Sequence, residues 1–158
     1  MQTTMTTTMT VSGTRSRISW VLAHLGRFPL AIVQVLFRLA IASVFLKAGS
    51  NKLASWELTV QLFADEYRVP VLPPELAAAL ATSVEIGCSL LLVVGLGTRL
   101  ATLPLLGTIA VIQTFVYPSA YAEHLTWASI LLFLLTRGGG VWSVDRAIGL
   151  EPADPAAP

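Results

Sequence analysis

Charge is scarce in this sequence. Only 12% of its 158 residues are Asp, Glu, Lys or Arg, whereas 54% are hydrophobic. An average soluble domain is about 25% charged, and a short soluble chain must cover a large surface relative to its core. The net charge of +1 offers no basic surface for nucleic acid. The composition therefore places the chain in a lipid bilayer and argues against a soluble domain and against a nucleic-acid partner.

Cysteine and histidine are also nearly absent. The single cysteine, Cys88, excludes an intrachain disulfide and a CxxC metal or redox motif, and its apolar surroundings predict a small buried hydrophobe. The two histidines, His24 and His124, fall on opposite faces of the topology given below, which argues against a haem held by both. Redox chemistry would therefore need a cofactor that diffuses in the membrane or belongs to a partner.

Four apolar segments are candidates to cross the membrane. About 20 apolar residues cross a ~30 Å hydrocarbon core as a helix. The predicted spans cover residues 28–46, 76–96, 100–117 and 123–137. The last one is short, so we expect it to tilt or to thin the bilayer locally. The predicted fold is an all-α bundle of four transmembrane helices over residues 28–146, between a disordered tail with an interfacial segment (1–27) and a disordered C-terminal tail (147–158).

The first predicted loop, residues 47–75, is too polar to span. Trp56, Val60, Phe63 and Tyr67 recur at steps of four, three and four, which predicts a short amphipathic helix. This helix either lies on the membrane surface or packs on its own bundle.

Basic residues near the span ends predict the orientation. With the N-terminus inside, six arginines lie on the inner face and three basic residues on the outer face. The excess of basic residues indicates the cytoplasmic side. The sequence therefore predicts a protein of a bacterial-type inner membrane with both termini in the cytoplasm.

Two charged residues, Arg38 and Glu85, interrupt the predicted spans. A charge at mid-bilayer costs ~2.5–3.5 kcal/mol on insertion scales. Each lies ten residues into its span from opposite faces, or ~15 Å deep at the helical rise, so we predict an ion pair inside the bundle. One interpretation is a pair that only specifies the fold. The other is a polar cavity for a quinone headgroup, a proton or a small polar ligand, lined also by Gln34 and Gln113.

A second candidate site lies near the outer face. Tyr117, Glu123 and His124 are close in sequence, and adjacent Glu and His side chains can bind a metal or relay a proton. The alternative is that these are ordinary residues of the membrane interface.

Three blocks of residues resemble the DoxX family of small four-helix membrane proteins. The first has Arg38, Phe45, Gly49 and Lys52, and the second runs from Glu85 through Gly95 to Arg99. The third is a glycine turn, residues 138–140, followed by Ser143 and Asp145, with Gly139 where the family usually has proline. The resemblance covers about residues 33–146. It marks Arg38, Glu85, Lys52, Arg99 and Asp145 as family-matching polar residues without assigning them a role.

The resemblance implies a membrane subunit of a quinone-linked oxidoreductase or redox-stress complex. In this hypothesis Arg38 would donate a hydrogen bond to a quinone carbonyl, while Glu85 would orient Arg38 or pass protons. A protein partner would supply the missing redox centre, or the chain would form a homo-oligomer. The alternative is a non-enzymatic membrane component that serves small-solute or metal-stress transport or acts as an assembly factor. Four spans are few for an independent transporter, so transport would require oligomerisation.

Overall fold

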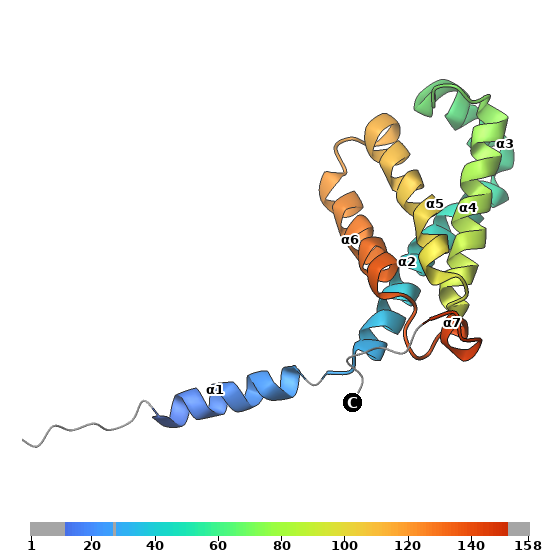
Figure 1. The fold of residues 1–158 in the computed structure, drawn as a ribbon. Coiled ribbons are helices and arrows are strands. Elements are labelled where there is room, and N and C mark those ends of the chain that lie inside the picture. The colour runs from blue at the N-terminus through green and yellow to red at the C-terminus, as the bar shows by residue number, and fades with distance from the viewer. Residues whose placement is uncertain (1–11, 27, 152–158) are drawn as a thin grey trace, which may run out of the picture. The chain divides into compact units, whose positions relative to one another are not determined.

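The computed structural model describes residues 12–26 and 28–151 and divides the chain into two compact units, residues 1–30 and 31–158 (Figure 1). The first unit contains helix α1, Ser12–Leu25. Its exposed residues include Trp20, whose carbonyl lies 3.1 Å from Nδ1 of His24. Helix α1 begins inside the stretch predicted as a disordered tail, so residues 12–17 are helical instead, while residues 1–11 and 27 lie outside the described residues.

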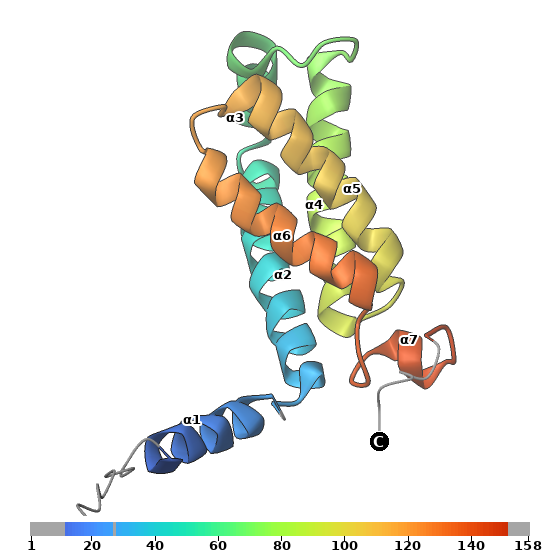
Figure 2. The ribbon, with the colours of Figure 1, turned by 60° about the vertical axis from the view of Figure 1, so that its left-hand side comes forward.

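Four long helices run side by side in the second unit (Figures 1 and 2). They are α2 (Leu30–Ala54), α4 (Pro74–Val94), α5 (Thr98–Val111) and α6 (Tyr121–Arg137). A π-helical segment, η2 (Ile112–Val116), continues α5. The described residues form helices and connections without any β-strand, which confirms the all-α class.

Three of these helical stretches are long and apolar enough to cross a membrane. They are Leu30–Ala54, Pro74–Val94 and Thr98–Val116. Helix α6 is shorter, at 17 residues. Many large apolar side chains on these helices face outward, including Leu80, Leu90 and Leu132, which are about half exposed. The protein is therefore a multi-pass membrane protein whose helices face lipid.

The bundle core draws residues from all four long helices. It comprises Ile41, Ala42, Phe45, Leu92, Ala101, Leu105, Ile109, Leu131 and Leu134. Helices α2 and α4 approach closely where Gly49 faces Ile86, because a Cβ on Gly49 would lie only 2.7 Å from the Ile86 side chain. Glycine at this point lets the two antiparallel backbones come together.

Helix α2 is longer than the predicted span over 28–46. It continues to Ala54 and thereby carries Lys47 and Lys52, which the sequence assigned to a loop. The predicted span ended at the first polar residues after the apolar run. In the structure the Lys52 ammonium is paired with Glu85 inside the bundle, so Lys52 is accommodated within the helix.

The two ends of the bundle are closed by short segments (Figures 1 and 2). At one end, α3 (Trp56–Leu62) and the π-helical η1 (Phe63–Tyr67) pack on α4, with Phe63 against Ala77 and Ala78. The amphipathic helix thus packs on its own bundle. At the other end lies α7 (Val144–Ala147). The tail predicted as disordered from 147 is described to Glu151, while residues 152–158 lie outside the described residues.

Candidate functional site

The Arg38 side chain is buried and bound by backbone carbonyls. Its Nε donates to Leu92 O at 2.8 Å and its Nη2 to Val93 O at 2.8 Å, at the end of α4. Its Nη1 donates to Gly139 O at 3.0 Å and Trp142 O at 2.9 Å. The last carbonyls of a helix lack intrahelical partners and carry partial negative charge, so the guanidinium ties the end of α4 to the turn that follows α6.

This geometry shows that the predicted Arg38–Glu85 ion pair is wrong. The Arg38 side chain reaches the Leu92 carbonyl, about two helical turns along α4 from Glu85. The prediction that Arg38 and Glu85 lie at equal depth took residue 46 as the end of the first helix. That helix ends eight residues later, so the two positions are not opposite each other. Four of the five N–H donors of Arg38 are bound to carbonyls, and Glu85 is paired with Lys52.

Three further side chains complete the polar end of the bundle around Arg38. Gln34 donates to Arg137 O at 3.1 Å, at the end of α6. The Asp145 carboxylate accepts hydrogen bonds from the Gly97 and Thr98 N–H groups at 2.6 and 2.8 Å and so caps α5. The Glu151 carboxylate accepts from Gly139 N at 2.7 Å, a bond that a proline at this position would not form.

We expect Asp145→Asn to destabilise the protein modestly. Asparagine keeps one acceptor oxygen but loses the carboxylate that binds two N–H groups at the start of α5, and loss of an N-terminal cap costs ~0.5–2 kcal/mol. Denaturation in detergent measures the loss. The exposed Glu123→Gln serves as the control and should leave stability unchanged. Equal stability of the two variants would contradict the capping role.

Glu85 is paired with Lys52. The Lys52 Nζ donates to both carboxylate oxygens at 2.8 Å. Glu85 is 1% exposed and Lys52 21% exposed. Each partner offsets the cost of burying the other. The pair therefore places equal and opposite charges inside the bundle, with the ammonium nearer to the surface.

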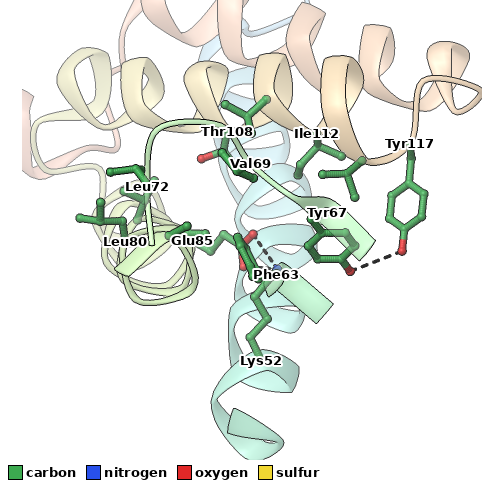
Figure 3. Close-up of a pocket in the computed structure, with 15 residues that line it drawn as sticks. Lys52, Phe63, Tyr67, Val69, Leu72, Leu80, Glu85, Thr108, Ile112 and Tyr117 are labelled. Carbon is green, nitrogen blue, oxygen red and sulfur yellow. Dashed lines mark hydrogen bonds and ion pairs between the residues drawn. The ribbon is translucent and has the colours of Figure 1, made fainter. Parts of the chain in front are cut away.

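The Lys52–Glu85 pair forms one wall of a cavity of about 240 Å³ (Figure 3). The other lining residues are mostly apolar and come from η1, the segment after it, α4, α5 and η2. They include Phe63, Val69, Leu72, Leu80, Ala81, Val84, Val111, Ile112 and Val116. A polar wall facing apolar walls is typical of a small-molecule site.

Two tyrosines line the same cavity. The hydroxyls of Tyr67 and Tyr117 lie 3.4 Å apart and link η1 to the end of η2 (Figure 3). Burial raises the pKa of Tyr67 above its ordinary value, and the hydrogen bond with Tyr117 raises it further. One of the two hydroxyl protons lies in the bond between the tyrosines, which leaves the other proton available to a ligand.

Most of the other predicted site residues lie neither beside Arg38 nor at the Lys52–Glu85 cavity. Gln113, expected beside Arg38, instead donates to Pro118 O at 2.8 Å, and its Oε1 lies 2.7 Å from Nδ1 of buried His124. Glu123 is exposed. Of the outer-face set, only Tyr117 reaches the cavity. Among the residues that the structure describes, no three His, Cys, Asp or Glu side chains are grouped to hold a metal ion.

The places of Lys52 and Tyr67 in the cavity were not predicted from the sequence. A signal for Lys52 was present, because the residues Arg38, Ala42, Phe45, Gly49 and Lys52 recur at steps of four, three, four and three. This spacing continues one helix face past the apolar run. No comparable signal marks the contact between Tyr67 and Tyr117, which are 50 residues apart.

The match to a protein family covers the two blocks of residues from Arg38 to Lys52 and from Glu85 to Arg99. No curated protein and no solved structure matches the chain at a significant level. The family model DoxX matches residues 33–118, which is more than half of the chain. The matched region contains Arg38, Lys52, Glu85 and Arg99 and ends before the glycine turn and Asp145. On this match the chain belongs to the DoxX family.

Proposed function

We propose that the protein is the membrane subunit of a quinone-linked oxidoreductase and that the Lys52–Glu85 cavity receives the quinone ring. The observation that carries the proposal is a cavity with apolar walls and one neutral ion pair at its polar wall. A bound quinone would supply the capacity to take up two electrons and two protons. In this proposal a partner protein supplies the electrons.

The residues of the cavity fit a neutral ring that accepts hydrogen bonds. Two Lys52 N–H groups are directed to Glu85, which leaves one of the three ammonium donors for a ligand. The charges of Lys52 and Glu85 cancel, so neither an anion nor a cation is favoured. The hydrogen-bonded pair of Tyr67 and Tyr117 adds a second donor on another side of the cavity.

The size and position of the cavity also fit such a ligand. Its volume of about 240 Å³ lies below the ~300–1,000 Å³ of sites that enclose drug-sized molecules. A ring therefore fills it, and an apolar tail extends among the lipids along half-exposed residues such as Leu80. Arg38 does not line the cavity, and four of its five N–H donors are bound to backbone carbonyls.

We further propose that the helices form four spans of a bacterial-type inner membrane with both termini in the cytoplasm. The end of the bundle that carries Arg38, Arg137 and Arg146 then faces the cytoplasm, and the cavity lies toward the opposite surface. This orientation follows the excess of basic residues at that end.

Binding of a short-tail quinone to the purified protein in nanodiscs tests the site. We expect calorimetric titration to detect binding to the wild type and to Lys47→Met, whose lysine is exposed on the same helix. Ala81→Phe should abolish binding, because the larger side chain fills the cavity and leaves the ion pair intact. Equal binding by Ala81→Phe and the wild type would refute the cavity as the site.

A further inference from the structure

Three buried hydroxyls of the described bundle have no hydrogen-bond partner in the protein. They belong to Thr82, Ser89 and Thr98, which are 5%, 0% and 0% exposed. A buried polar group without a partner costs ~1–3 kcal/mol, and in the great majority of cases such groups are satisfied by protein or by ordered water. Each of these hydroxyls therefore needs a partner.

Other hydroxyls of the bundle bond to their own helix. Those of Thr102, Thr108, Thr114, Thr126, Ser129 and Thr136 each donate to a carbonyl three or four residues earlier. This is the common arrangement for Ser and Thr within helices. Thr82 and Ser89 depart from it although they lie inside α4.

Two of these hydroxyls lie on the same face of α4 as Glu85. Thr82 lies three residues before Glu85 and Ser89 four residues after it, so all three share the buried face of α4. Ser89 lies one turn before Leu92, whose carbonyl binds Arg38. The unpartnered hydroxyls thus flank the buried carboxylate on both sides.

Thr98 extends the row to the other end of the bundle. Its N–H donates to the Asp145 carboxylate at 2.8 Å. Its hydroxyl faces the glycine turn, since a Cβ on Gly139 would lie 2.6 Å from Thr98 Oγ1. By their places on α4 and at the start of α5, Ser89 and Thr98 fall between Glu85 and the Asp145 end of the bundle, where Arg38 binds the Leu92 and Val93 carbonyls.

We propose that water molecules bound to Ser89 and Thr98 conduct protons between the Asp145 end of the bundle and Glu85. A hydroxyl both donates and accepts, so each one takes a proton from one water and passes its own to the next, and it is unchanged afterwards. Net transfer of one proton from solvent converts the Glu85 carboxylate to the acid, and the reverse transfer restores it. The use of that proton rests on the proposed function, because reduction of a quinone consumes protons.

Hydrogen–deuterium exchange at Glu85 tests the route without any quinone. In Lys52→Met the carboxyl loses its counter-charge and takes up a proton, so its carbonyl band is visible by infrared spectroscopy. We expect exchange to slow severalfold when Ser89→Ala is added. Thr102→Val, a buried hydroxyl bonded to its own helix, should leave the rate unchanged. Equal rates with and without Ser89→Ala would overturn the proposal.

X-ray radiolytic labelling of the wild-type protein gives a second measurement in case Lys52→Met does not fold. Leu92 and Leu131 are both fully buried in the core, but only Leu92 lies one turn from Ser89. We expect oxidation of Leu92 by radicals formed from trapped water, reduced by Ser89→Ala, and no oxidation of Leu131. Absence of label at Leu92 would overturn the route. Both measurements are independent of quinone binding, so failure of the titration would affect only the proposed ligand.

Discussion

Replacing Arg38 with methionine is expected to lower the free energy of unfolding by several kcal/mol and to reduce the amount of folded protein in the membrane. Four backbone carbonyls lose their donor, and a hydrogen bond to a charged group contributes ~1.5–3 kcal/mol. Two of these carbonyls belong to the end of α4, where the apolar surroundings provide little water to replace the donor. Methionine keeps most of the side-chain length, so the loss reports the hydrogen bonds rather than a cavity.

Arg38→Lys separates the effect of charge from that of geometry. A lysine ammonium keeps the positive charge near the end of α4, but it cannot present the planar fork that contacts four carbonyls on two elements. We therefore expect stability between that of the wild type and that of Arg38→Met, measured by denaturation in detergent. If Arg38→Met were as stable as the wild type, the guanidinium would not be what holds α4 to the turn after α6.

The sequence predicts two of the buried charges, Arg38 and Glu85, but not the burial of Asp145 and not how the charges pair. Arg38 and Glu85 stand out because charges are rare in apolar runs, and both are at most 3% exposed. Their partners depend on the register between α2 and α4. Residues Ala78, Thr82, Glu85, Ser89 and Leu92 recur at the same steps as the buried face of α2. Aligning the two faces does not give both contacts. Lys52 and Arg38 are fourteen residues apart on α2, whereas Glu85 and Leu92 are only seven apart on α4, so the long side chains reach along the helices to their partners.

The cavity could not be predicted from the sequence. Its walls require the π-helical segments η1 and η2 to bring Tyr67 next to Tyr117, and a π-helical turn has no simple sequence signature. The polar end of the bundle is a similar case. There Arg38 donates to the backbone carbonyls of Gly139 and Trp142. Residue types do not show which backbone carbonyls accept hydrogen bonds.

Removing one partner of the buried ion pair should be as costly as losing Arg38. Lys52→Met leaves Glu85, which is 1% exposed, without its counter-charge. Breaking a buried pair in this way typically costs about 3–5 kcal/mol. The cost arises because the carboxyl, left without its counter-charge, must take up a proton to remain buried. Glu85→Gln is expected to cost less, since Lys52 is 21% exposed and its ammonium can turn toward the surface.

The double variant Lys52→Met/Glu85→Leu distinguishes a functional pair from a purely structural one. Replacement of a buried pair by apolar residues of similar size is often neutral or stabilising, so we expect the double variant to recover most of the stability lost in Lys52→Met. We also expect it to fail to bind the short-tail quinone, because the cavity then has no ammonium donor. Recovery of stability together with wild-type binding would show that the pair only holds α2 against α4. A double variant no more stable than Lys52→Met would mean that the bundle needs the ion pair itself, and the stability argument for Glu85 would fail.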